Sequence, residues 1–562
     1  MRRLITMRKV LIGVLLSSTA AAQATTMESV PTNGYVCYPS RLTESRALSG
    51  DGRWIAFHNE SAAYFPFPLF TVLRDRWADT YEPLALDLTG QPVKNNCHID
   101  AGALSHDGRW VVFAAGPDNL VANDSNGIVD IVVRDRALEV YELASVGPGG
   151  VQTDNWSTHA VITDDGRFVA FTSRATTLAI GDANGLEDVF VRDRHLGVTE
   201  RISVALGASD SDGMSQYPSL TSDGRFVCFE SRASNLVIGD TNAANDVFLR
   251  DRAAGTTTVL STPTGSVHPV GGWKPWIAKD GSSVAFGVPT AAYGYSGATL
   301  GVVALDLTTS ALELVSLDPA GVPIFVSDRS MLSADGRFVV FNDGHTEPEV
   351  YRRDRALQRT ELASVRLPGK SGNAMSSHPH VSDDGRLVAF TSNSKELVNP
   401  MCVPNSSFNL FVRDFDGPAT TPIAYGTSKL SSESCSALIG AVGVASASGL
   451  DTFRLVGELA PRGRFGCVVW GVRQASTPFG GGTLYVQLPA RRTQVADSGG
   501  NFVCGGCVCS GAWSFAFTHE YMRAHGLAPG TTVYSQILFR DPGFDPPNDV
   551  GLTDALAWTL AP

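Results

Sequence analysis

The sequence predicts an all-β protein: a seven-bladed β-propeller, with six blades as the alternative, followed by a small β-sandwich. Three observations predict this fold. One short motif recurs seven times, the same short strand-forming segments follow it, and no helical segment separates the copies. The 56 glycines and 30 prolines agree with a chain of many short strands and turns.

The recurring motif is Asp-Gly-Arg followed by apolar, β-branched and aromatic residues, with Ser in place of Arg in one copy. An apolar residue three places before each Asp ends one strand, and the Asp-Gly pair makes a tight hairpin turn. A segment such as 167–171 (Arg-Phe-Val-Ala-Phe) then forms the next strand. The aspartates of the seven copies are Asp51, Asp107, Asp165, Asp223, Asp280, Asp335 and Asp384.

Two further segments complete each unit. In the third copy, residues 188–194 predict a third strand and residues 198–203 a fourth. A four-stranded unit cannot bury both of its faces alone, and stacking the units in a ring solves this problem. An open β-solenoid is the structural alternative, but these units are too long for its coils. We therefore predict the propeller over residues 36–427.

The motif copies resemble the repeats of TolB-type propellers, which carry S-x-D-G-x-x-V-A-F and D-[VI]-F-V-x-D segments. The resemblance covers roughly residues 40–425 of this chain. It implies the propeller fold, and since many members of this type have six blades, it keeps that number open. It implies no particular activity, because such propellers serve many functions.

The two ends of the chain predict separate roles. Residues 1–24 have a positive start, a short apolar stretch and small residues at the end, which is typical of a signal peptide. No later apolar run is long enough to span a membrane, so we expect a secreted or periplasmic protein. Residues 428–435 are a Ser-rich linker. Residues 436–562 predict the β-sandwich, and within them the segment 534–556 resembles a C-terminal module found on exported proteins of environmental bacteria.

The net charge is −12, and removal of the signal peptide takes away four cationic residues and no acidic ones. A chain this acidic is poorly suited to nucleic acids or anionic membrane surfaces. Its nine cysteines predict disulfides in an exported protein. Cys228 replaces Ala in a predicted buried strand and is expected to remain a thiol. The disulfide candidates are Cys37 with Cys97, and Cys504, Cys507 and Cys509 near the end of the chain.

The loop before the predicted third strand carries a D-x-N-G-x-x-D pattern, or a variant of it, in three consecutive units. Oxygen-bearing side chains around a tight turn are the ligands that Ca²⁺ prefers. Asp and Asn are also ordinary turn residues that bind local backbone donors. Structural turns are the first interpretation and calcium is the alternative. The candidate ligands are Asp124, Asn126, Asp130, Asp182, Asn184, Asp188, Asp240, Asn242 and Asp246.

The residue six places before each motif Asp falls on the innermost predicted strand. Because the repeat places these residues at equivalent sites, their side chains should cluster near one mouth of the central channel. A basic cluster in an acidic protein could bind an anionic ligand, while packing between blades or contact with channel water is the alternative. Five copies supply candidate binding residues, namely His159, Tyr217, Lys274, Arg329 and His378, and the other two supply Ser45 and Ala101.

Catalytic motifs mostly fail. The chain has no G-x-S-x-G, and the two histidines of 519–525 are six residues apart, so they do not share one helix face. We therefore predict an exported, monomeric scaffold or recognition protein that binds a protein or a small anionic or carbohydrate ligand. The alternative is a metal-dependent lyase, because some propellers resembling this type cleave acidic oligosaccharides and hold a metal with channel histidines. His159 and His378 could belong to such a site if a third ligand joined them.

Overall fold

The computed structural model describes residues 24–28, 46–59, 70–78, 80–93, 97–116, 120–326, 328–365, 375–394, 397, 408–415, 423–425, 428–433, 435, 437–442, 445, 453–461, 463–498, 511–546 and 548–560. These residues are almost entirely strands and turns, with one short α-helix, α1 (His519–Ala524). The all-β prediction is confirmed. Among the described residues no helix has the length and apolar character to cross a membrane.

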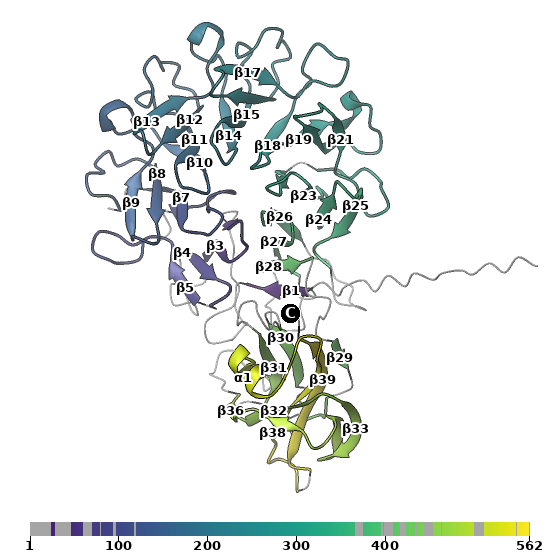
Figure 1. Ribbon diagram of the computed structural model, residues 1–562. Helices are drawn as coiled ribbons and strands as arrows, with labels where there is room; N and C mark the ends of the chain where they lie inside the picture. Colours follow the sequence, from purple (N-terminus) through teal and green to yellow (C-terminus); the bar gives the residue numbers. More distant parts are fainter. Residues whose placement is uncertain are drawn as a thin grey trace, which may run out of the picture.

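Seven four-stranded antiparallel sheets, numbered 1 to 7 here, stand around a common axis with their first strands innermost (Figure 1). Sheet 1 contains β2 (Arg46–Leu48), β3 (Trp54–Asn59), β4 (Phe70–Asp75) and β5 (Thr80–Pro83). Sheet 2 contains β6 (Cys97–His98), β7 (Trp110–Ala115), β8 (Asp130–Asp135) and β9 (Val140–Leu143). Sheet 3 contains β10 (Ser157–Ile162), β11 (Phe168–Ser173), β12 (Asp188–Asp193) and β13 (Val198–Arg201).

Sheets 4 to 7 repeat this order along the chain. Sheet 4 contains β14 (Ser215–Leu220), β15 (Phe226–Ser231), β16 (Asp246–Asp251) and β17 (Thr256–Val259), and sheet 5 contains β18 (Trp273–Ile277), β19 (Ser283–Pro289), β20 (Leu300–Asp306) and β21 (Leu312–Leu314). Sheet 6 contains β22 (Met331–Leu332), β23 (Phe338–Asn342), β24 (Val350–Asp354) and β25 (Arg359–Leu362). Sheet 7 contains β26 (Ser376–Val381), β27 (Leu387–Ser392) and β28 (Asn409–Asp414), and β1 (Ala24–Met27) is its fourth strand.

The recurring motif forms the hairpin turn between the first two strands of each sheet. In sheet 3, the Thr163 hydroxyl donates to Asp165 Oδ1 at 2.6 Å, and the same oxygen accepts the Arg167 N–H at 2.9 Å. Gly166 has φ +73°, a conformation that favours glycine. Arg167 then pairs with Asp193 at the end of β12 (2.7 Å), so the motif also fixes the third strand.

A second repeated arginine joins neighbouring sheets. It follows the last Asp of the third strand and reaches the outermost strand of the preceding sheet. Arg136 of sheet 2 pairs with Glu82 of β5 at 2.8 Å, and Arg252 of sheet 4 pairs with Glu200 of β13 at 2.9 Å. The apolar residues between the sheets are buried, including cross-strand pairs such as Phe171 and Phe190.

The chain closes the ring by supplying the outermost strand of sheet 7 from its N-terminal side. β1 pairs with β28, and the Asp383 N–H donates to the Gly50 carbonyl of sheet 1 at 2.8 Å. Side chains of sheets 1 and 7 share a buried apolar cluster that includes Phe57 and Leu410. The propeller sheets therefore include a strand upstream of residue 36, where the sequence analysis began the domain.

The tail contains two further sheets and a hairpin, and the two sheets share a separate apolar core. Its strands are β29 (Ile423–Tyr425), β30 (Leu438–Val442), β31 (Arg454–Ala460), β32 (Phe465–Gly471), β33 (Gln474–Phe479), β34 (Gly482–Val486), β35 (Arg491–Arg492), β36 (Ala496–Asp497), β37 (Gly511–Ala516), β38 (Thr532–Arg540) and β39 (Val550–Thr559). β29 pairs with β39, so the tail sheet recruits residues that the sequence analysis gave to the propeller. Strand pairing decides this boundary, and the motif ends before it.

Most cysteine predictions fall where the structure gives no account. Cys37, Cys504, Cys507 and Cys509, like residues 1–23 of the signal peptide prediction, lie outside the described residues. Cys97 is buried on β6, and its pairing with Cys37 stays a prediction. Cys228 is completely buried as a thiol on β15, as its place in the repeat predicts.

Candidate functional site

The innermost strands of four sheets share the same irregularity. Their pairing registers shift around the position six before the motif Asp, which is the mark of a β-bulge. The residues there, His159, Tyr217, Lys274 and His378, have φ of 52°, 53°, 46° and 54°. For a residue other than glycine this left-handed conformation costs roughly 1–2 kcal/mol. The same strained backbone therefore recurs at four equivalent points around the axis.

These bulges bring side chains from different sheets into contact. The rings of His159 and Tyr217 lie 4.4 Å apart between centroids. Lys274 Nζ lies 5.8 Å, and the Arg329 guanidinium carbon 5.6 Å, from the centre of the Tyr217 ring. Arg329 also lies 5.1 Å from the ring of Trp276. The Tyr217 ring thus has two cations near it, which its π-electrons attract.

Acidic residues that the sequence analysis missed neutralise part of this charge. Lys274 Nζ pairs with Asp328 Oδ1 at 3.0 Å, and the Lys274 N–H donates to Glu230 at 2.7 Å. Asp100 is close enough to act electrostatically on both His159 and Arg329. The expected basic ring is therefore a mixed-charge group. We call Asp100, His159, Tyr217, Glu230, Lys274, Asp328 and Arg329 the axial cluster.

A simple signal could have found two of these acids. Asp100 and Asp328 stand one place before the residues chosen for the ring. Comparing the residues seven places before each motif Asp would therefore have identified both. Glu230 lies on a second strand, β15, and no inner-strand pattern points to it.

The charge states in the axial cluster follow from burial. Burial lowers the pKa of His159 and so favours a neutral ring, although the negative charge of Asp100 acts in the opposite direction. Burial raises the pKa of Glu230 and of Tyr217. Burial would also raise the pKa of Asp328, but the charge and hydrogen bond of Lys274 outweigh it and lower that pKa. Lys274 and Asp328 therefore form a charged pair, and each side chain is about 30% exposed.

The N–H groups of Arg329 have only some of the hydrogen-bond partners they could have. Its Nη2 donates to the backbone carbonyls of Tyr217 at 3.3 Å and Pro218 at 3.5 Å. Its Nε is buried and has no hydrogen-bond partner among the described residues. At this level Trp276 of sheet 5 and Val161 of sheet 3 both lie close to Gly102, so side chains from different sheets meet beside the axis.

The remaining residues of the predicted ring occupy other surroundings. His378 Nδ1 lies 2.8 Å from the Ser377 hydroxyl, and its ring acts electrostatically on Asp328. Ala101 packs with Trp276 in an apolar cluster, and Ser45 lies outside the described residues. Within the part of the chain that the structure describes, no three His, Cys, Asp or Glu side chains converge to hold a metal. The third ligand of a lyase-like metal site is thus not found there.

A second charged group lies at the turn end of the same inner strands. The residue just before each motif Asp faces its counterparts around the axis, because backbone hydrogen bonds link neighbouring turns, as between Asp51 N and His106 O (2.9 Å). Lys279 Nζ bonds to Asp164 at 2.7 Å and to Asp383 at 2.9 Å, and Asp383 lies 2.6 Å from His106 Nδ1. The hydrogen bond from Asp383 raises the pKa of His106. We call these four residues the turn-side network.

The predicted calcium loops are organised by internal hydrogen bonds. Asn126 and Asn184 each accept the N–H two residues on, and each donates its amide to the second Asp of its loop, Asp130 at 2.8 Å and Asp188 at 3.1 Å. Asn242 does the same with Asp246 at 2.8 Å. These bonds belong to the turn interpretation. The first Asp takes no part in the bonds of the Asn side chain, but Asp124 and Asp240 accept the backbone N–H of Asn126 and Asn242.

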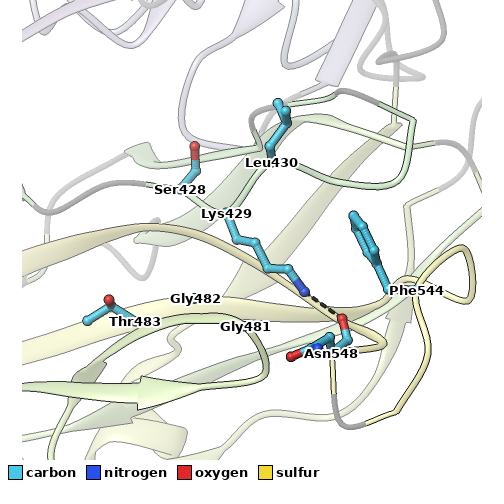
Figure 2. Close-up of a pocket in the computed structure, with 8 residues that line it drawn as sticks. All are labelled: Ser428, Lys429, Leu430, Gly481, Gly482, Thr483, Phe544 and Asn548. Atoms are coloured by element: carbon cyan, nitrogen blue, oxygen red, sulfur yellow. Dashed lines mark hydrogen bonds between the residues drawn. The ribbon is translucent and has the colours of Figure 1, made fainter.

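A cleft of about 540 Å³ lies in the tail domain, beside Lys429, Thr483 and Phe544 (Figure 2). Its one cation is already engaged. Lys429 Nζ donates to the carbonyls of Gly480 at 2.7 Å and Val550 at 2.8 Å, and also to that of Asn548. An ammonium with its three protons bound to carbonyls is a structural tie, so this cleft offers no cation to a ligand.

Comparison with known proteins finds likeness at the level of structure. The sequence matches no model of a known protein family and no curated protein. Among solved structures, TolB from Acinetobacter baumannii is 15% identical with a TM-score of 0.34, covering 57% of this chain and 63% of that one. The chain thus spans less than two thirds of that TolB.

Two other solved structures align over more of their length. An oligogalacturonate lyase in complex with manganese is 13% identical with a TM-score of 0.42, covering 71% of this chain and 97% of that one. The β-propeller domain of the Trilobed protease from Pyrococcus furiosus is 11% identical with a TM-score of 0.42, covering 68% of this chain and 100% of that one.

Proposed function

We propose that this protein is an exported recognition protein whose axial cluster binds a sugar that carries an acidic group. The observation that carries the proposal is the set of four left-handed bulges on the inner strands. Strained backbone at equivalent points is retained where it positions functional side chains. Here it turns imidazole, phenol and ammonium groups toward one another. The amino-terminal charge and hydropathy pattern supports export.

The chemistry of the axial cluster favours an acidic sugar over other anions. Lys274 is a partly exposed cation that can bind a carboxylate. The rings of Tyr217 and His159 offer an apolar face for the C–H groups of a sugar. Asp328 and Glu230 can accept hydroxyl protons. A plain inorganic anion would use the cation alone and would be repelled by the two carboxylates.

The turn-side network sets the direction of approach. Lys279 with its two aspartates ties sheets 3, 5 and 7 together across the axis. Because that end is bridged by ion pairs, the ligand approaches the axial cluster from the opposite face of the ring. Lys274 and Lys279 both lie on sheet 5 and both have side chains that are 29% exposed, so they form a matched pair for a test.

Isothermal titration calorimetry with trigalacturonate, and with maltotriose as the neutral sugar, tests this proposal. We expect the acidic trisaccharide to bind and Lys274→Gln to weaken its binding about 10–100-fold, the value of a charge-assisted hydrogen bond. Lys279→Gln should leave the affinity unchanged. Equal loss in both variants, or equal binding of the neutral sugar, contradicts the proposal. Release of an unsaturated sugar during the titration would indicate a lyase.

A further inference from the structure

The three Asp-rich loops of sheets 2, 3 and 4 have the same sequence plan but different electrostatic surroundings. In sheet 3, Arg201 of β13 places Nη1 3.4 Å from Asp182 Oδ1, and it also bonds to Asp210. The Asp182 side chain is only 3% exposed, so the guanidinium supplies a cation inside the loop. A buried carboxylate requires such a partner.

Sheets 2 and 4 lack this arginine. Arg201 stands opposite Phe190 in its strand pair, and the equivalent residues are Leu143, opposite Val132, and Val259, opposite Phe248. Their loops still contain both carboxylates. Each first Asp is close enough to the second to repel it electrostatically, Asp124 to Asp130 and Asp240 to Asp246, as Asp182 is to Asp188.

The carboxylates of sheet 4 have few side-chain partners, and one buried hydroxyl near them lacks a hydrogen bond. Asp240 is 7% exposed and accepts the backbone N–H of Asn242, and among the described residues no side chain pairs with it. The Tyr293 Oη atom is buried without a hydrogen-bond partner there and interacts electrostatically with Asp246. Asp124 Oδ1 in sheet 2 and Asp182 Oδ1 in sheet 3 are likewise buried without a hydrogen bond, but only Asp182 has a guanidinium, that of Arg201, within ion-pair distance.

The second carboxylate of each loop is already oriented. Asp246 accepts from the Ser261 hydroxyl, the Asn242 amide at 2.8 Å and the Gly271 N–H at 3.2 Å. Those bonds fix the carboxylate and leave lone pairs on its oxygens. A pre-oriented carboxylate beside a second one, with oxygen atoms that lack partners, suits a hard divalent cation of flexible geometry.

We propose that the loops of sheets 2 and 4 each bind a Ca²⁺ ion through Asp124 with Asp130 and Asp240 with Asp246, and that Arg201 takes the ion's place in sheet 3. This refines the calcium hypothesis from three equivalent loops to two. It is independent of sugar binding, because the loops lie outside the axial cluster.

Adding an arginine to the loops of sheets 2 and 4, or removing Arg201 from that of sheet 3, tests this inference in the full-length chain. Chelator-treated protein is titrated with CaCl₂ by calorimetry, and its melting curve is recorded with Ca²⁺ and with chelator. We expect wild type to bind two ions and to melt several degrees higher with Ca²⁺. Val259→Arg and Leu143→Arg should each remove one ion, and together they should remove the calcium response. Arg201→Leu should add a third ion and lower the melting temperature in chelator.

Two controls keep the outcome decisive. Asp240→Asn preserves the volume of the side chain and should lose one ion even if the arginine cannot be accommodated at position 259. MgCl₂ should give a smaller shift than CaCl₂, since Mg²⁺ demands regular octahedral geometry. The proposal is overturned if wild type binds no Ca²⁺, in which case a shared proton relieves the paired carboxylates, or if Asp240→Asn still binds two ions.

Discussion

Cys228 occupies a position at which the other six motif copies have alanine or valine, in the strand after the turn. Its thiol is completely buried on β15, and burial raises its pKa. Cys228→Ala should therefore change the free energy of unfolding by less than about 1.5 kcal/mol, whereas Cys228→Ser should cost about 1–3 kcal/mol by burying an unpaired hydroxyl. Urea unfolding of the three proteins measures this. A serine variant as stable as wild type would mean that the hydroxyl finds a partner.

Single residues also show where sequence analysis stops. The side chains of His159, Tyr217, Lys274 and Arg329 lie close together in the structure, because equivalent positions in stacked units are neighbours around the axis. It does not give their charge balance, which depends on Asp100, Asp328 and Glu230. Asp100 and Asp328 stand one place earlier in the repeat and Glu230 lies on a second strand, so a pattern of one position per unit misses all three.

At the scale of the element, the motif turn is held by close packing against the neighbouring sheet as well as by hydrogen bonds. A Cβ on Gly166 would lie 2.4 Å from the Trp110 ring of the neighbouring sheet, while Gly185, also at positive φ, has open space around it. Gly166→Ala should cost about 2–4 kcal/mol, from the left-handed backbone and the overlap together, and Gly185→Ala only about 1–2 kcal/mol. Chemical denaturation of both variants measures the difference. Equal losses would show that the Trp110 ring moves aside freely.

Elements were predictable where the period of the sequence carries them. The turns and the second and third strands follow from the Asp-Gly motif and the β-branched segments, and the structure places them there. The role of the arginine after the third strand was not predictable from the pattern. Arg252 binds Glu200 of the preceding sheet, and a contact between sheets leaves no periodic trace within one unit.

At the scale of the whole molecule, one strand decides whether the ring is closed. β1 is far from β28 in sequence and carries no motif, so the sequence analysis began the propeller after it. Glu28, next to β1, makes the ion pair that Glu82 and Glu200 make in other sheets, although it stands two residues beyond the equivalent strand position, which Thr26 occupies. It pairs with Arg76 at 2.9 Å and with Arg74 at 3.0 Å, both from sheet 1. The same repeated ion pair therefore joins the last sheet to the first.

Burial distinguishes the Glu28 closure from the other joints of the ring. The Glu28 side chain is 4% exposed, against 36% for Glu200 in its pair with Arg252. Removing one partner of a buried pair costs roughly 3–5 kcal/mol, whereas an exposed pair contributes about 0–1 kcal/mol. Glu28→Gln should therefore lower the free energy of unfolding by about 3 kcal/mol, and Glu200→Gln by less than 1 kcal/mol. Because Glu28 also joins the two ends of the ring, amide hydrogens of β1 and β28 should exchange faster in Glu28→Gln, while those of β12 and β13 stay protected. Equal losses of stability, or unchanged exchange at β1, would mean that the apolar contacts between sheets 1 and 7 hold the ring closed without the ion pair.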